Sequence, residues 1–300
     1  MRSVWWIWLW VWWCVPALAE VGEIPLKDPH RVVFFALGDQ GSGSDHQRRV
    51  AAAMERVAAA DRGVDFVLLL GDNFYPDGVA SVTDPQWSSA FESIYTGKML
   101  DKTPFLAILG NHDGHANPEA QVLYGLQSLG SGRWRMRGRQ DVWEFGRGTG
   151  NQPLLRLVLL DSLAPVERQA EFARQALSGG GTPVWRLVAA HYPLRSSGRH
   201  GSSRALLTAL LPVLQAGGVE AYLCGHDHHL EVIRRPGEPL QIISGAGGHV
   251  PYSVGERLPG SEFALQGQHG FFRVEVNPTS LLFTAFDDRG ERLHQSRIDR

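Results

Sequence analysis

Six apolar runs of strand length recur along this 300-residue chain, and they limit its fold more than any other feature. Apolar residues follow one another in these runs without polar alternation, which is typical of strands buried on both faces of a sheet. The runs span residues 31–37, 64–70, 105–109, 154–161, 185–190 and 220–224. Helical patterns lie between some of them, at residues 46–62, 166–177 and 203–216. This succession of strands and helices predicts an α/β fold.

The chain from Leu230 onward has a different pattern. Short apolar segments there alternate with turn residues such as Pro236-Gly237 and Asn277-Pro278, which predicts an antiparallel meander. Among the helical segments, we expect Gly63 to cap the first and Pro212 to kink the last. No linker or low-complexity stretch divides residues 20–300, so we expect a single catalytic domain over that range.

Polar side chains follow five of the apolar runs, at the point where each predicted strand ends. In open α/β sheets ligands bind outside the carboxyl ends of the strands, so we expect these side chains to converge. Carboxylates, an amide oxygen and imidazoles together suit iron, zinc or manganese, and a carboxylate can bridge two such ions. The residues concerned are Asp39, Asp72 with Tyr75, Asn111-His112-Asp113, His191, and the pair His226 and His228.

Each of these residues also has a plain structural interpretation. Aspartate after glycine is a common turn former, so Asp39 alone would favour a structural role, and the same holds for residues 111–113. Tyr75 could cap an edge of the core. The pair His226 and His228 is more specific, because alternate residues of an extended chain can reach neighbouring points. Five coincidences in this order favour a metal site.

The other histidines have weaker claims. His200 lies nine residues after His191 in a loop, where an ordinary exposed histidine is the simpler interpretation. We expect His229 to be exposed. His115 and His249 lie in loops near the predicted rim, and a structural role is favoured for both. No function is predicted for the remaining four, which are His30, His46, His269 and His294.

The motifs, taken as a set, resemble those of the metallophosphoesterase superfamily. They read GDQG (38–41), GDNFY (71–75), GNHD (110–113), AHYP (190–193) followed by His200-Gly201, and CGHDHHL (224–230). Within that superfamily the chain is similar to the purple acid phosphatases of the small, tartrate-resistant type. The resemblance covers residues 31–290 and implies a four-layer αββα sandwich of two mixed sheets flanked by helices.

The resemblance also implies roles for individual residues. His112 would reach the substrate with Asp113 orienting its ring, and His200 would protonate the leaving group of a small phosphomonoester. Hydroxide generated at a metal pair would attack the phosphorus. A ferric ion would be held by Asp39, Asp72, Tyr75 and His228, and a divalent iron, zinc or manganese ion by Asn111, His191 and His226, with Asp72 bridging the two.

The N-terminus has the pattern of a secretory signal. Arg2 precedes an apolar stretch at residues 4–15 and a small-residue site at residues 17–19, so we expect residues 1–19 to be removed and the protein to be periplasmic or secreted. An uncleaved interfacial anchor is the alternative. A stretch this short does not span a membrane, so no stable span should remain after cleavage. Without it Cys224 is the single cysteine, which excludes an internal disulfide.

Charge and composition limit the partners. The chain has 29 basic and 31 acidic residues and a formal net charge of −2, which gives no basis for nucleic-acid binding. We expect a monomer acting on small substrates. One basic segment, residues 133–139, reads RWRMRGR, and as a strand it would place four arginines on one face. The favoured interpretation is a solvated face that packs Trp134 and Met136 inward.

Two other functions remain open on this evidence. One is a phosphodiesterase or nucleotidase of the same superfamily. The other is a metal- or phosphate-binding protein without turnover, against which the full donor set with His112 and His200 argues.

Overall fold

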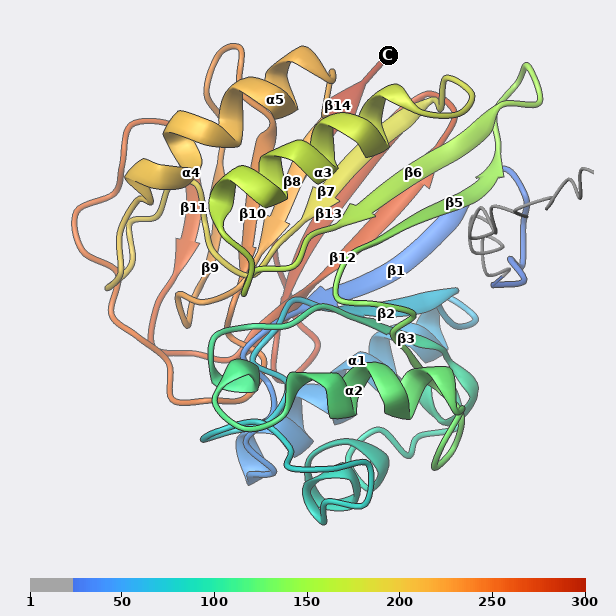
Figure 1. Ribbon diagram of the computed structural model, residues 1–300, viewed down its shortest axis with the longest axis vertical. Coiled ribbons are helices and arrows are strands. Elements are labelled where there is room, and N and C mark those ends of the chain that lie inside the picture. The colour runs from blue at the N-terminus through green and yellow to red at the C-terminus, as the bar shows by residue number, and fades with distance from the viewer. Residues whose placement is uncertain (1–23) are drawn as a thin grey trace, which may run out of the picture.

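The computed structural model describes residues 24–300, which form two seven-stranded mixed β-sheets stacked face to face (Figure 1). The predicted signal sequence, residues 1–19, lies outside the described residues. The first sheet has the order β14-β13-β12-β1-β2-β3-β4. Its strands are β1 (Val32–Leu37), β2 (Phe66–Leu69), β3 (Phe105–Ala107), β4 (Trp134–Arg135), β12 (Gly270–Asn277), β13 (Ser280–Asp287) and β14 (Arg292–Asp299).

The second sheet has the order β11-β9-β10-β8-β7-β6-β5. The six predicted apolar strands are β1 to β3 and β6 to β8, and within each sheet they pair in parallel. Strand β4 extends the parallel part of the first sheet, and β10 that of the second. The strands of the second sheet are β5 (Asp141–Arg147), β6 (Pro153–Leu159), β7 (Trp185–Ala189), β8 (Ala221–Cys224), β9 (Leu230–Ile233), β10 (Leu240–Ser244) and β11 (Ser261–Leu265).

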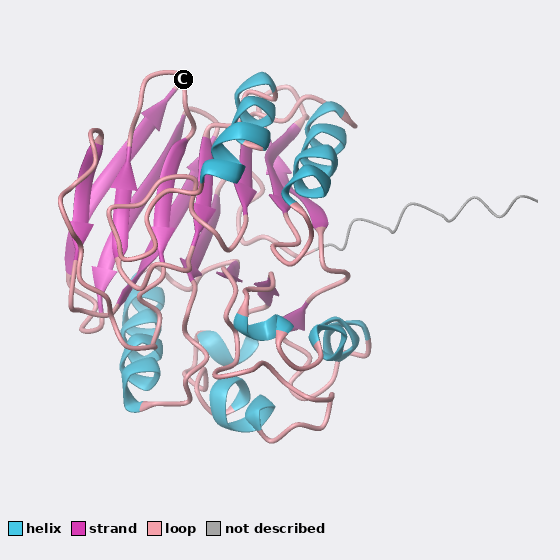
Figure 2. Cartoon of the chain, turned by 60° about the vertical axis from the view of Figure 1, so that its left-hand side comes forward, coloured by secondary structure: helices cyan, strands magenta, loops and turns pink. Residues whose placement is uncertain are grey.

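Helices cover the outer face of each sheet, which completes the four layers (Figures 1 and 2). Helices α1 (Asp45–Ala60) and α2 (Pro118–Leu126) lie on the first sheet, with short helical turns at Trp87–Glu92, Leu100–Lys102 and His112–Gly114. Helices α3 (Val166–Ser178), α4 (Arg204–Ala209) and α5 (Leu211–Ala216) lie on the second sheet. This is the αββα arrangement that the resemblance implied.

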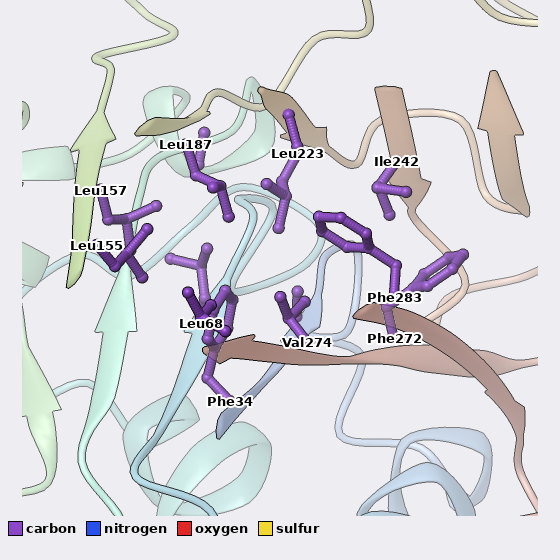
Figure 3. Close-up of a cluster of buried hydrophobic side chains, with 14 of the residues drawn as sticks. Phe34, Leu68, Leu155, Leu157, Leu187, Leu223, Ile242, Phe272, Val274 and Phe283 are labelled. Carbon is purple, nitrogen blue, oxygen red and sulfur yellow. The ribbon is translucent and has the colours of Figure 1, made fainter. Parts of the chain in front are cut away.

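Alternate residues of the central strands face different layers, and both sets are buried. In β1, Phe34 packs between the two sheets, whereas Phe35 packs against α1. Figure 3 shows the inner layer, where Leu187 and Leu223 of the second sheet face Phe272 and Phe283 of the first. Because both faces are covered, these strands have no solvent-facing positions, which explains their unbroken apolar sequences.

The helical predictions hold with two refinements. Helix α1 ends at Ala60, and the amide of Gly63, at φ 93°, then donates to the carbonyl of Ala58. The segment 203–216 is broken at Leu210 instead of kinked. Helix α5 begins at Leu211 with Pro212 in its first turn, because a proline lacks the amide that a continuing helix needs.

The C-terminal meander is only partly as predicted. Strands β12, β13 and β14 form it at one side of the first sheet. Strands β9 and β11 join the second sheet instead, and β10 pairs with β8 in parallel. The C-terminal segment therefore contributes strands to both sheets. Pairing with strands distant in the sequence determines the sheet to which each one belongs.

The arginine-rich segment does not form a face of four guanidinium groups. Only Trp134–Arg135 is strand, and Trp134 and Met136 are buried as favoured. Arg133 is also buried, where it pairs with Glu92 at 3.0 Å, so it contributes nothing to a basic surface. Over residues 24–300, no helix is both long and apolar enough to cross a membrane.

Candidate metal centre

The loops after the parallel strands of both sheets meet at one edge of the sandwich. Asp39 follows β1, Asp72 follows β2 and Asn111 follows β3 in the first sheet. His191 follows β7, and the pair His226 and His228 follows β8 in the second. The amide of Gly38 donates to the carbonyl of Ser244 at 2.7 Å, which fastens the two edges together.

The phenol of Tyr75 is the centre of one group of donors. Its oxygen lies 3.2 Å from Asp39 Oδ1, 3.0 Å from Asp72 Oδ2 and 3.2 Å from His228 Nε2. His228 Nε2 is 3.4 Å from Asp39 Oδ1. A phenol has one proton and cannot satisfy three acceptors. A cation surrounded by these four side chains would resolve that conflict, so the donors fit a metal.

A second group of donors lies on the other side of Asp72. His191 Nε2 is 3.1 Å from Asn111 Oδ1 and 3.5 Å from Asp72 Oδ2. The ring of His226 is 5.1 Å from that of His191, centroid to centroid. Asp72 Oδ2 therefore belongs to both groups. Ligand atoms of Asp39, Asp72 and His191 all lie within 4.8 Å of one another.

Backbone carbonyls orient two of the imidazoles. Nδ1 of His191 lies 2.9 Å from the carbonyl of Leu70, and Nδ1 of His228 lies 2.8 Å from the carbonyl of Val250. A carbonyl only accepts, so each Nδ1 must carry the proton. The lone pair of Nε2 is then directed into the donor groups, as in metal-binding histidines.

Backbone amides fix the two carboxylates in a complementary way. Asp39 Oδ2 accepts from the amide of His226 at 2.8 Å, and Asp72 Oδ1 accepts from the amide of His112 at 2.9 Å. In each aspartate, one carboxylate oxygen is thus held by a backbone amide and the other faces the donor groups. The contact between Asp39 and His226 also joins a loop of the first sheet to a loop of the second.

The main chain is strained at three of the donor residues. Asp39, Asp72 and His226 have φ values of 58°, 53° and 68°, in a region that non-glycine residues rarely adopt. Close packing imposes these turns. A Cβ on Gly110 would lie 2.2 Å from Asp72 Oδ1, and one on Gly225 would lie 2.5 Å from Asp39 Oδ2. These glycines are required because the carboxylates occupy the space of a side chain.

The electrostatics of the site are those of crowded, desolvated donors. Burial alone would raise the pKa of Asp72, but the imidazole of His191 outweighs it and holds the pKa below its usual range. Burial, followed by the charge of His191, lowers the pKa of His226 to about 2. Burial and the carboxylates of Asp39 and Asp72 raise the pKa of Tyr75 far above its usual value. Ionisation of that phenol therefore requires a positive charge beside it.

His112 lies at the mouth of the site, but Asp113 does not orient its ring. Nδ1 of His112 is 2.5 Å from the carbonyl of Pro76, so a backbone group holds the imidazole. Asp113 is fully buried and accepts from the amides of Gly110 and Asn73. Its predicted catalytic role is wrong because the turn at 112–114 directs it inward, where it braces two metal-site loops.

His200 lies at the edge of the second group of donors. Its ring is 4.2 Å from that of His226, and its amide donates to Asp227 Oδ1 at 2.9 Å. Asp227 is fully buried and also accepts from the hydroxyl of Ser196. The sequence analysis missed Asp227, although its place between His226 and His228 was the available signal.

The expectation for His229 is wrong. It is fully buried and lies 3.0 Å from the equally buried carboxylate of Glu231. Glu231 accepts hydrogen bonds from Ser197 and Ser261 as well, so the carboxylate has the partners that a buried charge needs, whereas Nδ1 of His229 has no hydrogen-bond partner. Two aromatic rings at the site were also missed: His249 stacks on Tyr75 at 4.1 Å, and Tyr252 stacks on His228 at 4.0 Å.

Comparison with known proteins identifies the family of this chain. The family model described as calcineurin-like phosphoesterase matches residues 28–230. The chain is 30% identical to human tartrate-resistant acid phosphatase type 5, over 95% of this chain and 94% of that protein. It is 30% identical to purple acid phosphatase 4 of Arabidopsis thaliana, over 93% and 86% of the two chains. A solved structure described as GAP50, the anchor in the inner membrane complex of Plasmodium, matches with a TM-score of 0.80 and 25% identity, over 90% of this chain and 89% of that one.

Proposed function

Because this chain belongs to the calcineurin-like phosphoesterase family, and within it to the purple acid phosphatases, we propose that it hydrolyses phosphomonoesters at a binuclear metal centre. It is a phosphoric monoester hydrolase of the acid phosphatase type. The observation that carries the binuclear proposal is the position of Asp72 Oδ2, within 3.5 Å of both the Tyr75 phenol and His191 Nε2.

The donors favour two different ions. Asp39, Asp72 and Tyr75 supply three oxygens beside the single imidazole of His228, a set that suits a hard trivalent ion such as Fe³⁺. The second set contains two imidazoles and an amide oxygen, which suits divalent iron, zinc or manganese. Such a pair supplies Lewis acidity, lowering the pKa of a water and neutralising charge on phosphoryl oxygens.

The protein itself positions the substrate and handles the leaving group's proton. His112 is anchored through Nδ1, so its Nε2 is left to contact a phosphoryl oxygen. His200 lies beside His226 at the edge of the second donor set, where it protonates the departing alkoxide. The low pKa of His226 keeps that imidazole neutral, and so able to bind a cation, at acid pH.

We also propose that the enzyme acts outside the cytoplasm. The support is the signal-like sequence of residues 1–19, together with the stability of a ferric centre in oxidising surroundings. We expect a monomer whose mature chain begins near Glu20. N-terminal sequencing of the exported protein measures this directly, and an intact N-terminus would instead support the anchor alternative.

The test of the function combines metal analysis with two substrates. We expect the purified full chain to hold two metal ions per molecule and to hydrolyse phenyl phosphate much faster than bis-phenyl phosphate. The control is Asp65→Asn, which removes a buried carboxylate at the opposite end of β2 and should leave both measurements unchanged. A strong preference for the diester would favour a phosphodiesterase.

A second candidate function is a metal- or phosphate-binding protein without turnover. A solved structure described as an anchor has the same fold at 25% identity, which keeps a role without turnover open. Two bound metals with no hydrolysis of phenyl phosphate between about pH 4 and pH 8, a range that spans carboxylate and imidazole titration, would support this candidate over the enzyme.

A further inference from the structure

Two loops of the second sheet form one wall of the site mouth, and neither belongs to the metal-binding motifs. The first carries Tyr252, whose amide donates to the carbonyl of His228 at 2.9 Å. Its ring lies parallel to the imidazole of His228, with centroids 4.0 Å apart and an angle of 13°. The phenol ring of Tyr252 therefore lies directly against a metal-site side chain and continues its surface outward.

The second loop brings a guanidinium group to the same ring. The Cζ atom of Arg199 lies over the ring of Tyr252, 5.3 Å from its centroid, a distance typical of a cation–π contact. Because His228 covers one face of that ring, the guanidinium occupies the other. Arg199 is exposed, and none of the carboxylates within residues 24–300 forms an ion pair with it. Its charge is held in place yet remains free to bind an anion.

The position of Arg199 is fixed by its neighbours on both sides. His200 follows it, with its amide bound to Asp227. Ser197 precedes it and is bound to the buried Glu231 and to the amide of Gly255. A loop anchored in this way holds its charge close to one point, which reduces the entropy lost when a ligand binds.

The opposite side of the mouth differs in charge. Asp77 lies there, 3.2 Å from His115, and its side chain is 67% exposed. The carbonyl of Pro76 holds His112 on that side. An anionic group extending from the site would therefore be repelled near Asp77 and attracted near Arg199.

We propose that Arg199 and Tyr252 form a subsite for a second anionic group on the substrate, carried by its leaving group. His200 places the departing oxygen on this side of the site, and Arg199 directly precedes it in the chain. The subsite selects phosphoesters whose alcohol bears a carboxylate or another acidic group, over neutral phosphoesters of the same size. The proposal rests on the phosphatase function and adds a substrate class to it.

The test compares two substrates that differ in one charge. Para-carboxyphenyl phosphate and para-carbamoylphenyl phosphate have leaving groups of similar shape. Only the first has a leaving group that carries a negative charge. We expect the metal-loaded full chain to favour the carboxylate about 2–5-fold in kcat/KM at low salt, the range of an exposed ion pair. The preference should shrink as ionic strength rises. Arg199→Gln should bring the ratio to that of the intrinsic reactivities, and Arg199→Glu should reverse it.

A matched control separates a local effect from a change in overall charge. Arg174→Glu makes the same charge change on an exposed position of α3 and should leave the substrate ratio as in the wild type. Tyr252→Leu should lower the preference because the guanidinium loses its platform, whereas Tyr252→Phe should retain it. An Arg199→Glu variant with the wild-type substrate ratio would overturn the proposal.

A binding measurement keeps this test independent of turnover. Calorimetry with the two corresponding aryl phosphonates, which cannot be hydrolysed, should show tighter binding of the carboxylate by the wild type and not by Arg199→Glu. Equal binding by the wild type would overturn the subsite even if hydrolysis proceeds. Tighter carboxylate binding without any hydrolysis of either phosphate would support the subsite and overturn the proposed enzyme.

Discussion

The two sheets contribute different chemistry to the same site. The first sheet supplies only oxygen donors, from Asp39, Asp72, Tyr75 and Asn111, and the second sheet supplies only imidazoles. Each donor group nevertheless draws on both sheets, since His228 joins the carboxylates and Asn111 joins His191. Neither sheet alone supplies a complete group of donors. The two proposed metal ions would therefore connect the two sheets.

The two sets of donors also differ in the backbone groups that contact them. Backbone amides donate to the carboxylates of the first sheet, whereas backbone carbonyls accept from two imidazoles of the second. Amide donors stabilise the charged form of a carboxylate, and carbonyl acceptors fix the tautomer of a histidine. The backbone contacts therefore fix which atom of each of these donors faces the site.

Removal of Asp72 should have the largest effect, because its Oδ2 atom is shared by both donor groups. In Asp72→Ala we expect both metals to be lost together and kcat/KM to fall at least ~10³-fold, beyond the cost of one lost transition-state contact. Elemental analysis and a phenyl phosphate assay measure this. Loss of one metal alone would show that Asp72 does not bridge.

Removal of an imidazole from the second sheet should be milder and confined to one ion. In His226→Ala we expect loss of the divalent ion and a fall in activity of roughly 10²-fold, while the ferric ion and its visible absorption remain. Excess divalent metal should restore part of the activity. His294→Ala, in the distant strand β14, serves as the control. Disappearance of the visible absorption in His226→Ala would contradict the assignment of His226 to the divalent ion.

Lowering the pH should release the two proposed metal ions at different pH values. Burial alone would lower the pKa of His191, but the charge of Asp72 raises it to about 10, so a metal at His191 must displace a proton. Below that pKa the affinity of the divalent site should fall by about tenfold per pH unit. The pKa of Asp72 stays below its usual range, and a trivalent ion opposes protonation of Tyr75 more strongly than a divalent ion opposes protonation of His191. Dialysis at decreasing pH should release the divalent ion first, and earlier loss of the ferric ion would refute this order.

Removal of the phenol oxygen should have the smallest effect on turnover. In Tyr75→Phe we expect loss of the visible charge-transfer absorption with less than about a tenfold loss of kcat, because the oxygen contacts metal donors and not the leaving group. A visible spectrum beside a rate measurement decides it. Retention of the absorption would mean that Tyr75 is not a ligand.

The positions of four proposed metal ligands could be predicted from the sequence. Unbroken apolar strands and the polar residue after each one locate Asp39, Asp72, Asn111 and His191 at the carboxyl ends of a parallel arrangement. That prediction needs only the rule that such ends share one edge of a sheet. The central strands follow from the same apolar pattern, whereas the four layers were implied by the resemblance to the family.

The supporting residues could not be predicted in this way. His229 is buried beside Glu231, whose carboxylate accepts from Ser197 and Ser261, and no local pattern reports serine contacts that are thirty or more residues away. Asp113 turns inward because the amides of Gly110 and Asn73 need an acceptor. Tyr252 lies in an irregular loop without hydrophobic periodicity, so its stacking on His228 has no signal in the sequence.

The close approach of two buried carboxylates to one phenol has a consequence for the life of the protein. Like charges at such short range weaken a folded chain until a cation lies between them, and an ion that binds only the folded form adds stability in proportion to its availability. Resistance to heat and to proteases should therefore report metal occupancy. Protein molecules without their metal ions would be less stable and would be degraded first, so the metal site itself would determine which molecules persist.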